Sequence, residues 1–170
     1  MEAYKILTYP DPFLKIIAKP VTLFDEELQE ISERMIQTMY EGIGVGLAAT
    51  QVGVNKRLFV MDVSYNKDLP ESERNPIVVI NPKIIEKADK QAGEEGCLSV
   101  PEFRADVERY RQVKLQYRDL KGDLKEMDAE DLAAVCIQHE IDHLKGKLFI
   151  DYLPPLQRNM IKKKLKKRVE

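Results

Sequence analysis

The chain has 170 residues, of which 44% are apolar, and a formal net charge of −2 at pH 7. This length suits one domain, and the apolar content supports a core without disulfides. No window approaches the roughly 18 consecutive apolar residues that a membrane span needs. Residues 1–7 lack the apolar run of a signal peptide, and the two cysteines lie far apart. We therefore expect a soluble, cytoplasmic protein with no membrane partner.

The net charge hides a basic C-terminal segment. Residues 158–170 hold seven of the 27 basic residues and one of the 29 acidic ones, which leaves 20 basic and 28 acidic residues, or −8, in residues 1–157. Such a block is typical either of an interaction tail or of a solvated helix face. We divide the chain into a main domain, residues 1–156, and a basic C-terminal helix or tail, residues 157–170.

The first predicted helix covers residues 25–41. Its apolar residues recur at helical spacing, and Gly42 supplies a stop. Residues 42–51 follow, too rich in glycine for a stable helix and too apolar for a solvated loop. We expect another group to approach this backbone closely.

Short apolar or β-branched runs predict strands at residues 57–63 and 77–81, with a polar surface loop at 64–76 between them. Residues 113–117 alternate between apolar and polar side chains. Turn residues at 119–123 and a second run at 124–127 complete a predicted hairpin.

A second helix is predicted from an N-cap at Asp128 to a stop at Gly146. One inward-facing stripe of this helix carries Leu132, Val135, Cys136, His139 and His143. Strands, a hairpin and two long helices without regular βαβ alternation indicate an α+β fold.

His139 and His143 are the only histidines, and Glu140 directly follows the first. Positions i and i+4 of a helix share a face, so both imidazoles can reach one metal ion, with Glu140 beside it as a general base. The alternative, two histidines spaced this way by chance, is weakened by the apolar helix around them.

A catalytic metal site usually takes three protein ligands. Asp151 is the third ligand if the site resembles that of an HExxH endopeptidase, and Cys97 is the upstream candidate. Cys136 is the candidate if it closes a structural Cys₂His₂ site, although its place on the apolar stripe favours a packing role.

Three motifs together resemble the peptide deformylase family. They are Gly-Val-Gly-Leu-Ala-Ala-Thr-Gln at 44–51, Glu-Gly-Cys-Leu-Ser at 95–99 and Gln-His-Glu-Ile-Asp-His at 138–143. The resemblance extends from residues 9–12 to residues 146–153. It implies short antiparallel sheets packed around a central metal-bearing helix, a C-terminal helix, and a catalytic domain in residues 1–156.

The resemblance also implies an activity: removal of the formyl group from the N-terminal formylmethionine of newly synthesised polypeptides. Cys97, His139 and His143 would hold Fe²⁺, and Zn²⁺, Ni²⁺ or Co²⁺ could occupy the same ligands. Metal-bound water would attack the formyl carbon while Glu140 acts as general acid and base. Gln51 and the backbone NH of Leu98 would stabilise the oxyanion.

Substrate contacts are expected along the same motifs. Gly44 and Gly46 would let an extended peptide lie against the loop, and a methionine pocket would be walled by Val45, Leu132, Val135 and Cys136. Arg104 would hold the substrate backbone or an acidic group such as Glu95, with a surface ion pair as the competing interpretation. The basic C-terminal segment would suit ribosomal RNA, which makes the ribosome an expected partner.

Overall fold

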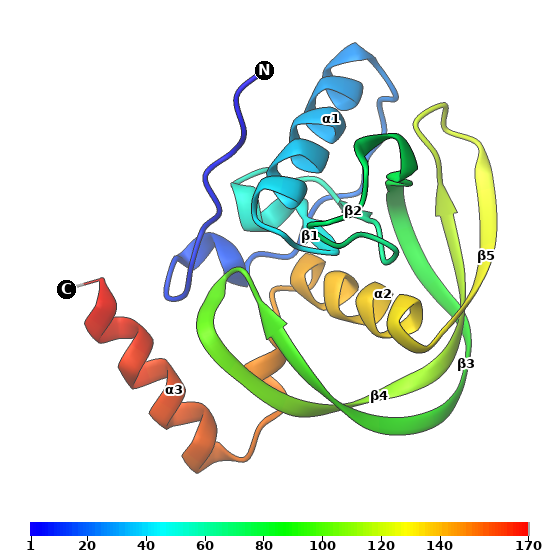
Figure 1. The fold of residues 1–170 in the computed structure, drawn as a ribbon. Coiled ribbons are helices and arrows are strands. Elements are labelled where there is room, and N and C mark those ends of the chain that lie inside the picture. The colour runs from blue at the N-terminus through cyan, green and yellow to red at the C-terminus, as the bar shows by residue number, and fades with distance from the viewer. Residues whose placement is uncertain (170) are drawn as a thin grey trace.

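A computed structural model describes residues 1–169. Within these residues, two further helices and five strands are arranged around a central helix, α2 (Figure 1). In chain order they are α1 (Glu26–Glu41), β1 (Gly46–Ala48), β2 (Leu58–Met61), β3 (Ile77–Cys97), β4 (Val100–Arg118), β5 (Leu124–Glu130), α2 (Asp131–Leu144) and α3 (Pro155–Arg168), with 3-10 turns at Pro12–Lys15, Ala49–Val52, Glu71–Glu73 and Phe149–Tyr152. The predicted α+β class is confirmed.

Helix α1 forms where the sequence predicts it. The Asp25 side chain caps its start by accepting a hydrogen bond from the backbone N of Leu28 at 3.0 Å, and Gly42 is its C-cap. The capping bond satisfies one of the free amides of the first turn.

Among residues 1–169 the strands form one antiparallel sheet in the order β1-β2-β3-β4-β5. Strand β2 is buried on both faces. Leu58 and Val60 point to the core shared with α1, whereas Phe59 and Met61 point to the core shared with α2. The two helices therefore cover opposite faces of β1 and β2 (Figure 1), as the period of two along a strand requires.

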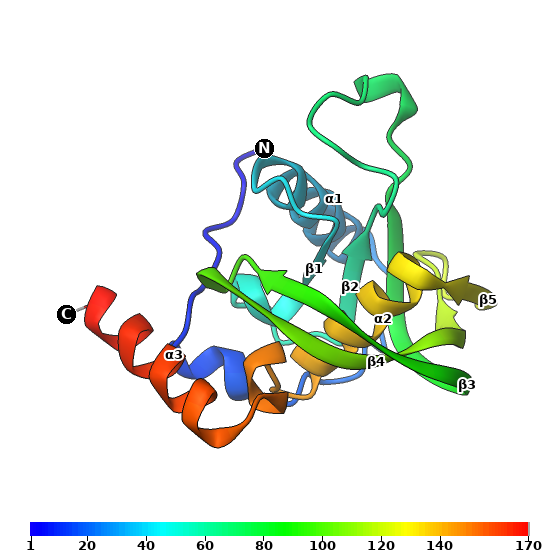
Figure 2. The same cartoon turned by 60° about the horizontal axis from the view of Figure 1, so that its bottom comes forward.

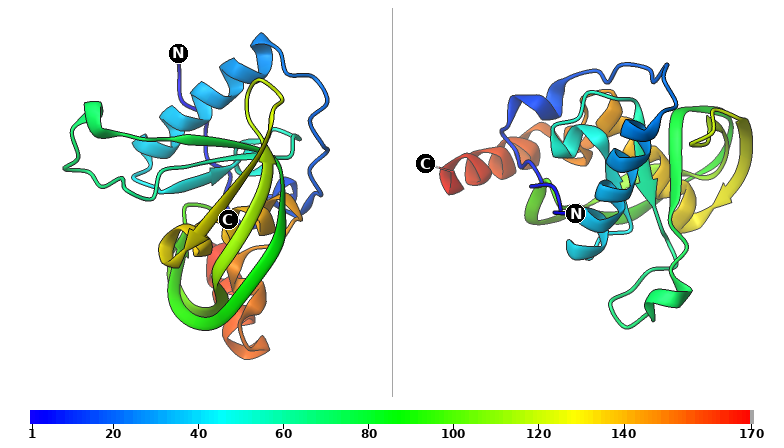
Figure 3. Two further views of the ribbon diagram at one scale, coloured as in Figure 1. Left: turned by 90° about the vertical axis from the view of Figure 1, so that its right-hand side faces the viewer. Right: turned by 90° about the horizontal axis from the view of Figure 1, so that it is seen from above.

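Strands β3 and β4 are much longer than the sequence predicted. The strand predicted at 77–81 continues to Cys97 and pairs with β4, and the predicted hairpin of residues 113–117 and 124–127 is confirmed as the pairing of β4 with β5. Register shifts at Ile80/Lys83 and Ile84/Glu86 interrupt the β3–β4 ladder. The β3–β4 hairpin curves around α2 (Figures 1 and 3). Register shifts of this kind favour bending of the strands.

Helix α2 begins two residues later than predicted, because its N-cap is Glu130. Asp128 does not cap it, because β5 continues to Glu130 and Asp128 pairs with Lys114 of β4. The predicted end is close to the observed one, since the helix stops at Leu144 and Gly146 adopts a positive φ of 78°.

Residues 157–168 of the basic C-terminal segment lie in helix α3, which is at one side of the molecule beside the β3–β4 hairpin (Figure 2). Ile161 and Leu165 are buried in a cluster that also contains Val100 and Phe149. Within residues 1–169, no helix is long and apolar enough to cross a membrane.

Candidate active site

Helix α2 carries the three residues of the histidine motif into the interior. His139 is 9% exposed, His143 1% and Glu140 4%. The predicted inward-facing stripe is therefore confirmed for the histidines. It is wrong for Leu132, which is 53% exposed, because the first turn of α2 lies at the rim of a cavity.

Cys97 reaches the histidines from the end of β3, where the ladder shifts register between Gly96 and Cys97. Its Sγ lies 3.3 Å from Nε2 of His143, and the Nε2 atoms of His139 and His143 are 3.2 Å apart. The three ligand atoms all lie within 4.8 Å of one another. This is the only group of at least three His, Cys, Asp or Glu side chains in residues 1–169 whose ligand atoms are close enough together to hold one metal ion.

The alternative third ligands do not join this group. Asp151 accepts a hydrogen bond from the backbone N of Leu148 at 2.9 Å and pairs with Nζ of Lys162 at 3.1 Å. Cys136 lies on α2 with its Sγ 3.8 Å from the carbonyl oxygen of Val45. The endopeptidase-like and Cys₂His₂ arrangements are therefore not formed.

Glu95 orients the first histidine from behind. Its Oε1 lies 2.9 Å from Nδ1 of His139, and because a carboxylate only accepts, Nδ1 is the donor and Nε2 is the atom that faces the other candidate ligands. Arg109 binds Glu95 through two hydrogen bonds, from Nε at 2.9 Å and from Nη2 at 3.0 Å. Sequence reasoning missed Arg109, which lies 14 residues after Glu95.

The electrostatics around the ligands favour positive charge. Burial lowers the pKa of His139, but its interactions with Cys97, Glu140 and Glu95 outweigh burial and raise it well above its usual value. Burial lowers the pKa of His143 and keeps that imidazole neutral. A cation among these donors would take the place that a proton otherwise holds.

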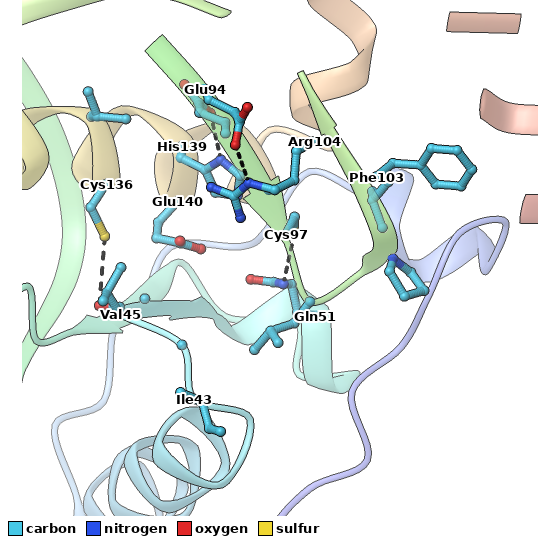
Figure 4. Close-up of a pocket in the computed structure, with 18 of the residues that line it drawn as sticks. Ile43, Val45, Gln51, Glu94, Cys97, Phe103, Arg104, Cys136, His139 and Glu140 are labelled. Carbon is cyan, nitrogen blue, oxygen red and sulfur yellow. Dashed lines mark hydrogen bonds and ion pairs between the residues drawn. The ribbon is translucent and has the colours of Figure 1, made fainter. Parts of the chain in front are cut away.

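Glu140 projects into the cavity beside the ligand group (Figure 4). Burial raises its pKa to about 7, although the charge on His139 opposes the shift. Its Oε1 is buried and accepts no hydrogen bond from residues 1–169. A buried carboxylate oxygen without a protein partner is free to bind a water or a reacting group.

Gln51 is held by the turn that follows β1. Its Oε1 accepts from the backbone N of Ala48 at 2.9 Å, which directs Nε2 to Ser99 Oγ at 3.0 Å and toward Cys97 Sγ at 3.5 Å (Figure 4). The side-chain amide of Gln51 therefore faces the ligand group.

Close packing against neighbouring side chains explains the glycines of the glycine-rich motif. A Cβ on Gly46 would lie 2.7 Å from both Cys136 Sγ and Glu140 Oε2, and one on Gly44 would lie 3.1 Å from the side chain of Leu98. The close approach expected for this backbone is thus made by α2 and by the β3–β4 turn.

A cavity of about 640 Å³ opens beside these groups. Every residue predicted to contact substrate lines it: Gly44, Val45, Gly46, Arg104, Leu132, Val135 and Cys136, together with Gln51, Leu98 and Glu140. Sequence analysis missed Ile43 and Phe103, because nothing in their local pattern separates them from ordinary core or loop positions.

Arg104 does not pair with Glu95. Its Nε binds Oε1 of Glu94 at 2.7 Å, and both side chains are about 60% exposed. The surface ion pair is therefore the arrangement present, and Arg109 occupies the place beside Glu95.

The chain is similar to known proteins over almost its whole length. Residues 3–159 match the family model of polypeptide deformylase. A peptide deformylase of Alkalilimnicola ehrlichii is 48% identical over 169 residues, which cover 99% of this chain and 92% of that protein. The crystal structure of a peptide deformylase from Legionella pneumophila has a TM-score of 0.89 and 46% identity, covering 97% of this chain and 94% of that one.

A second solved structure, peptide deformylase from Ehrlichia chaffeensis in complex with actinonin, also has a TM-score of 0.89, at 36% identity, and covers 99% of this chain and 98% of that one. Family match, identity and coverage agree with the geometry of the ligand group. The chain belongs to the polypeptide deformylase family.

Proposed function

We propose that this protein hydrolyses the formyl group from the N-terminal formylmethionine of newly synthesised polypeptides in the cytoplasm, through a metal centre held by Cys97, His139 and His143. The observation that carries the proposal is the convergence of these three donors beside a buried, unpartnered glutamate on the wall of a cavity. A deformylase needs this combination, because the amide must be polarised while a proton is moved.

The donor set fits a divalent cation. One thiolate and two neutral imidazoles leave a formal charge of +1 on the centre, and the set suits Fe²⁺, with Zn²⁺, Ni²⁺ or Co²⁺ as alternatives. When bound, such an ion lowers the pKa of water and polarises a carbonyl. We propose Fe²⁺ because of the family resemblance.

Glu140 moves the proton. Its free Oε1 is available to accept a proton from the attacking water and deliver it to the departing amine. A Cβ added to Gly46 would lie 2.7 Å from Glu140 Oε2, so the carboxylate is packed against the β1 backbone, which keeps it in one orientation.

Gln51 and Leu98 stabilise the negative charge that develops on the formyl oxygen. The fixed amide of Gln51 has an N–H directed toward Cys97, and the backbone NH of Leu98 follows Cys97 directly. Removing one donor of this kind typically costs about 3 kcal/mol of transition-state stabilisation.

The methionine side chain enters the apolar part of the cavity. Val45, Leu132, Val135 and Cys136 form its wall, and Gly44 and Gly46 leave the backbone beside it open to an extended peptide. Arg104, at the rim with Glu94, is available to hold the substrate backbone.

Substitution of each candidate ligand tests the centre. In anaerobically prepared protein, Cys97→Ala should lose both the metal and formate release from formyl-Met-Ala-Ser. Asp151→Ala and Cys136→Ala should keep the metal. A Cys97→Ala protein with full metal content and full rate would overturn the assignment. Inhibition of formate release by actinonin, which the Ehrlichia chaffeensis relative binds, is the expected companion result.

We further propose that α3 binds the ribosome. Burial of Ile161 and Leu165 leaves Lys163, Lys164 and Lys167 exposed on the helix, where they can neutralise phosphates. Changing these three lysines to glutamate in the full chain should weaken co-sedimentation with ribosomes and its dependence on salt. Unchanged, salt-sensitive binding would rule out this role.

A further inference from the structure

A continuous chain of hydrogen bonds runs outward from His139 to the surface. It passes from Glu95 to Arg109, whose Nη1 donates to Oδ2 of Asp142 at 2.6 Å. The same Oδ2 accepts from Oη of Tyr152 at 2.8 Å. Glu95, Arg109 and Asp142 are each less than 10% exposed, whereas Tyr152 is 49% exposed.

The chain joins four different elements. Glu95 is on β3, Arg109 on β4, Asp142 on α2 and Tyr152 on the 3-10 turn Phe149–Tyr152. No single element fixes the position of Arg109. Its guanidinium is gripped by Glu95 on one side and by Asp142 on the other, so both carboxylates determine where Glu95 lies relative to His139.

Tyr152 closes the outer end. Its ring lies beneath the Arg109 guanidinium, with Cζ 5.0 Å from the ring centroid. Arg109, Asp142 and Tyr152 line a groove that does not contain the candidate ligands. Burial and the contact with Asp142 raise the pKa of Tyr152 to about 12, so the phenol remains the donor in this bond.

The charged residues of this hydrogen-bonded chain favour a cation at the ligand group. Two carboxylates and one guanidinium carry a net charge of −1 directly behind His139. The hydrogen bond from Nδ1 of His139 to Glu95 keeps the proton on Nδ1. It thereby leaves Nε2 available as a ligand and holds the ring at one angle. None of Arg109, Asp142 and Tyr152 lines the substrate cavity, so their effect on substrate must be indirect.

We propose that Tyr152 and Asp142 are positioning residues of the metal centre: by holding Arg109 against Glu95 they fix the tautomer and orientation of His139 and slow the release of the ion. This inference rests on the proposed function, because it takes Cys97, His139 and His143 as the ligands. A purely structural role for Tyr152 predicts a loss of stability without a specific effect on the metal.

The test compares two Tyr→Phe variants of the full chain. Tyr152→Phe keeps the ring beneath Arg109 and removes only the hydroxyl. Tyr40→Phe is the matched control, because its hydroxyl also donates to a buried carboxylate, Asp62, at 2.6 Å, but outside the candidate site. Both proteins are loaded with Co²⁺ without oxygen, and the loss of the Co²⁺ absorption is followed after addition of an excess of chelator.

Tyr152→Phe should release Co²⁺ about 10-fold faster than the wild type, and Asp142→Asn about 10- to 100-fold faster, by analogy with the roughly 10- to 100-fold loss of metal affinity that follows removal of a partner of a ligand histidine. Tyr40→Phe should release Co²⁺ at the wild-type rate. The KM for formyl-Met-Ala-Ser should stay unchanged in Tyr152→Phe. The inference is overturned if Tyr152→Phe is within twofold of the wild type, or if both Tyr→Phe variants are equally fast.

The outcome is separable from that of the proposed function. If wild-type protein binds Co²⁺ but releases no formate, the proposed function fails while the release rates still decide the role of Tyr152. If Asp142→Asn does not fold, Tyr152→Phe alone decides it.

Discussion

Two buried carboxylates of this protein have opposite environments. Asp62, 2% exposed, follows β2 and accepts hydrogen bonds from Tyr40 Oη at 2.6 Å, from Ser64 Oγ at 2.7 Å and from the backbone N of Asn75 at 3.0 Å. Glu140, 4% exposed, has an oxygen that accepts no hydrogen bond from residues 1–169. Similar burial thus comes with a complete set of donors in one region and an incomplete set in the other.

The pKa values follow the same division. Burial alone raises the pKa of a carboxyl group. In Asp62 the hydrogen bonds from Tyr40, Ser64 and Asn75 outweigh burial and lower the pKa, whereas the pKa of Glu140 is raised to about 7. A satisfied buried carboxylate ties elements together, here α1 and the 64–76 loop to β2. An unsatisfied one costs stability and is retained where a reaction needs it.

Glu140→Gln should give the largest effect on activity and separates the two carboxylates most clearly. It should lower kcat/KM for formyl-Met-Ala-Ser on the order of 10²- to 10⁴-fold, because the proton carrier is lost. The free energy of unfolding should be unchanged or higher, since a neutral amide is cheaper to bury than a carboxylate. Formate release, metal content and urea unfolding measure the three quantities. Activity within tenfold of the wild type would mean that Glu140 does not carry the proton.

Gly46→Ala sharpens the contrast by moving Glu140 without removing it. The added Cβ would meet Glu140 Oε2 and Cys136 Sγ at 2.7 Å. Relief of these contacts should displace the Glu140 carboxylate, and a misplacement of about 1 Å should lower kcat about 100-fold. Gly93→Ala in β3 is the matched control, because apart from its two chain neighbours no residue has a heavy atom within 4 Å of its Cβ position, and it should have wild-type activity. Equal rates for the two alanine variants would contradict close packing of Glu140 against β1.

Asp62→Asn should change stability and leave chemistry intact. Losing a carboxylate that accepts this set of hydrogen bonds should lower the free energy of unfolding by about 1–3 kcal/mol at pH 7. Because the pKa of Asp62 is lower in the folded protein, its stabilisation is present above the unfolded pKa of about 3.9 and is lost as the pH falls through the folded pKa. The difference from the wild type should therefore shrink below pH 4.

Urea unfolding at pH 7, 5 and 3 measures this difference. Formate release at 25 °C should match that of the wild type. A large drop in rate in a folded Asp62→Asn protein would show that the two regions are coupled.

The sequence was sufficient for the parts of the site that lie within one motif. The spacing of His139 and His143 predicts a shared helix face, and the structure has one. Arg109 could not be predicted, because its contact with Glu95 depends on the curvature and register of the β3–β4 hairpin, whose β3 strand shows no apolar alternation over residues 86–94. The contact of Tyr152 with Asp142 depends in turn on how α2 and the turn Phe149–Tyr152 pack against that hairpin.

Predictions from local sequence patterns were wrong where strand pairing competed with them. Asp128 is a good helix cap by residue type, yet the ladder between β4 and β5 includes it, and α2 begins only after the ladder ends at Glu130. The early part of β3 was predicted, because residues 77–80 are apolar and β-branched. Residues 86–94 are exposed and lack large apolar side chains, and only their pairing with β4 makes them a strand.

The most direct test of the proposed function measures formate and peptide products together, using anaerobically prepared, Fe²⁺-loaded protein and formyl-Met-Ala-Ser. The account predicts one formate released for each intact Met-Ala-Ser, with the rate abolished by a chelator and restored by Fe²⁺. Cleavage between residues of the peptide without formate, or no product from metal-loaded protein, would contradict it.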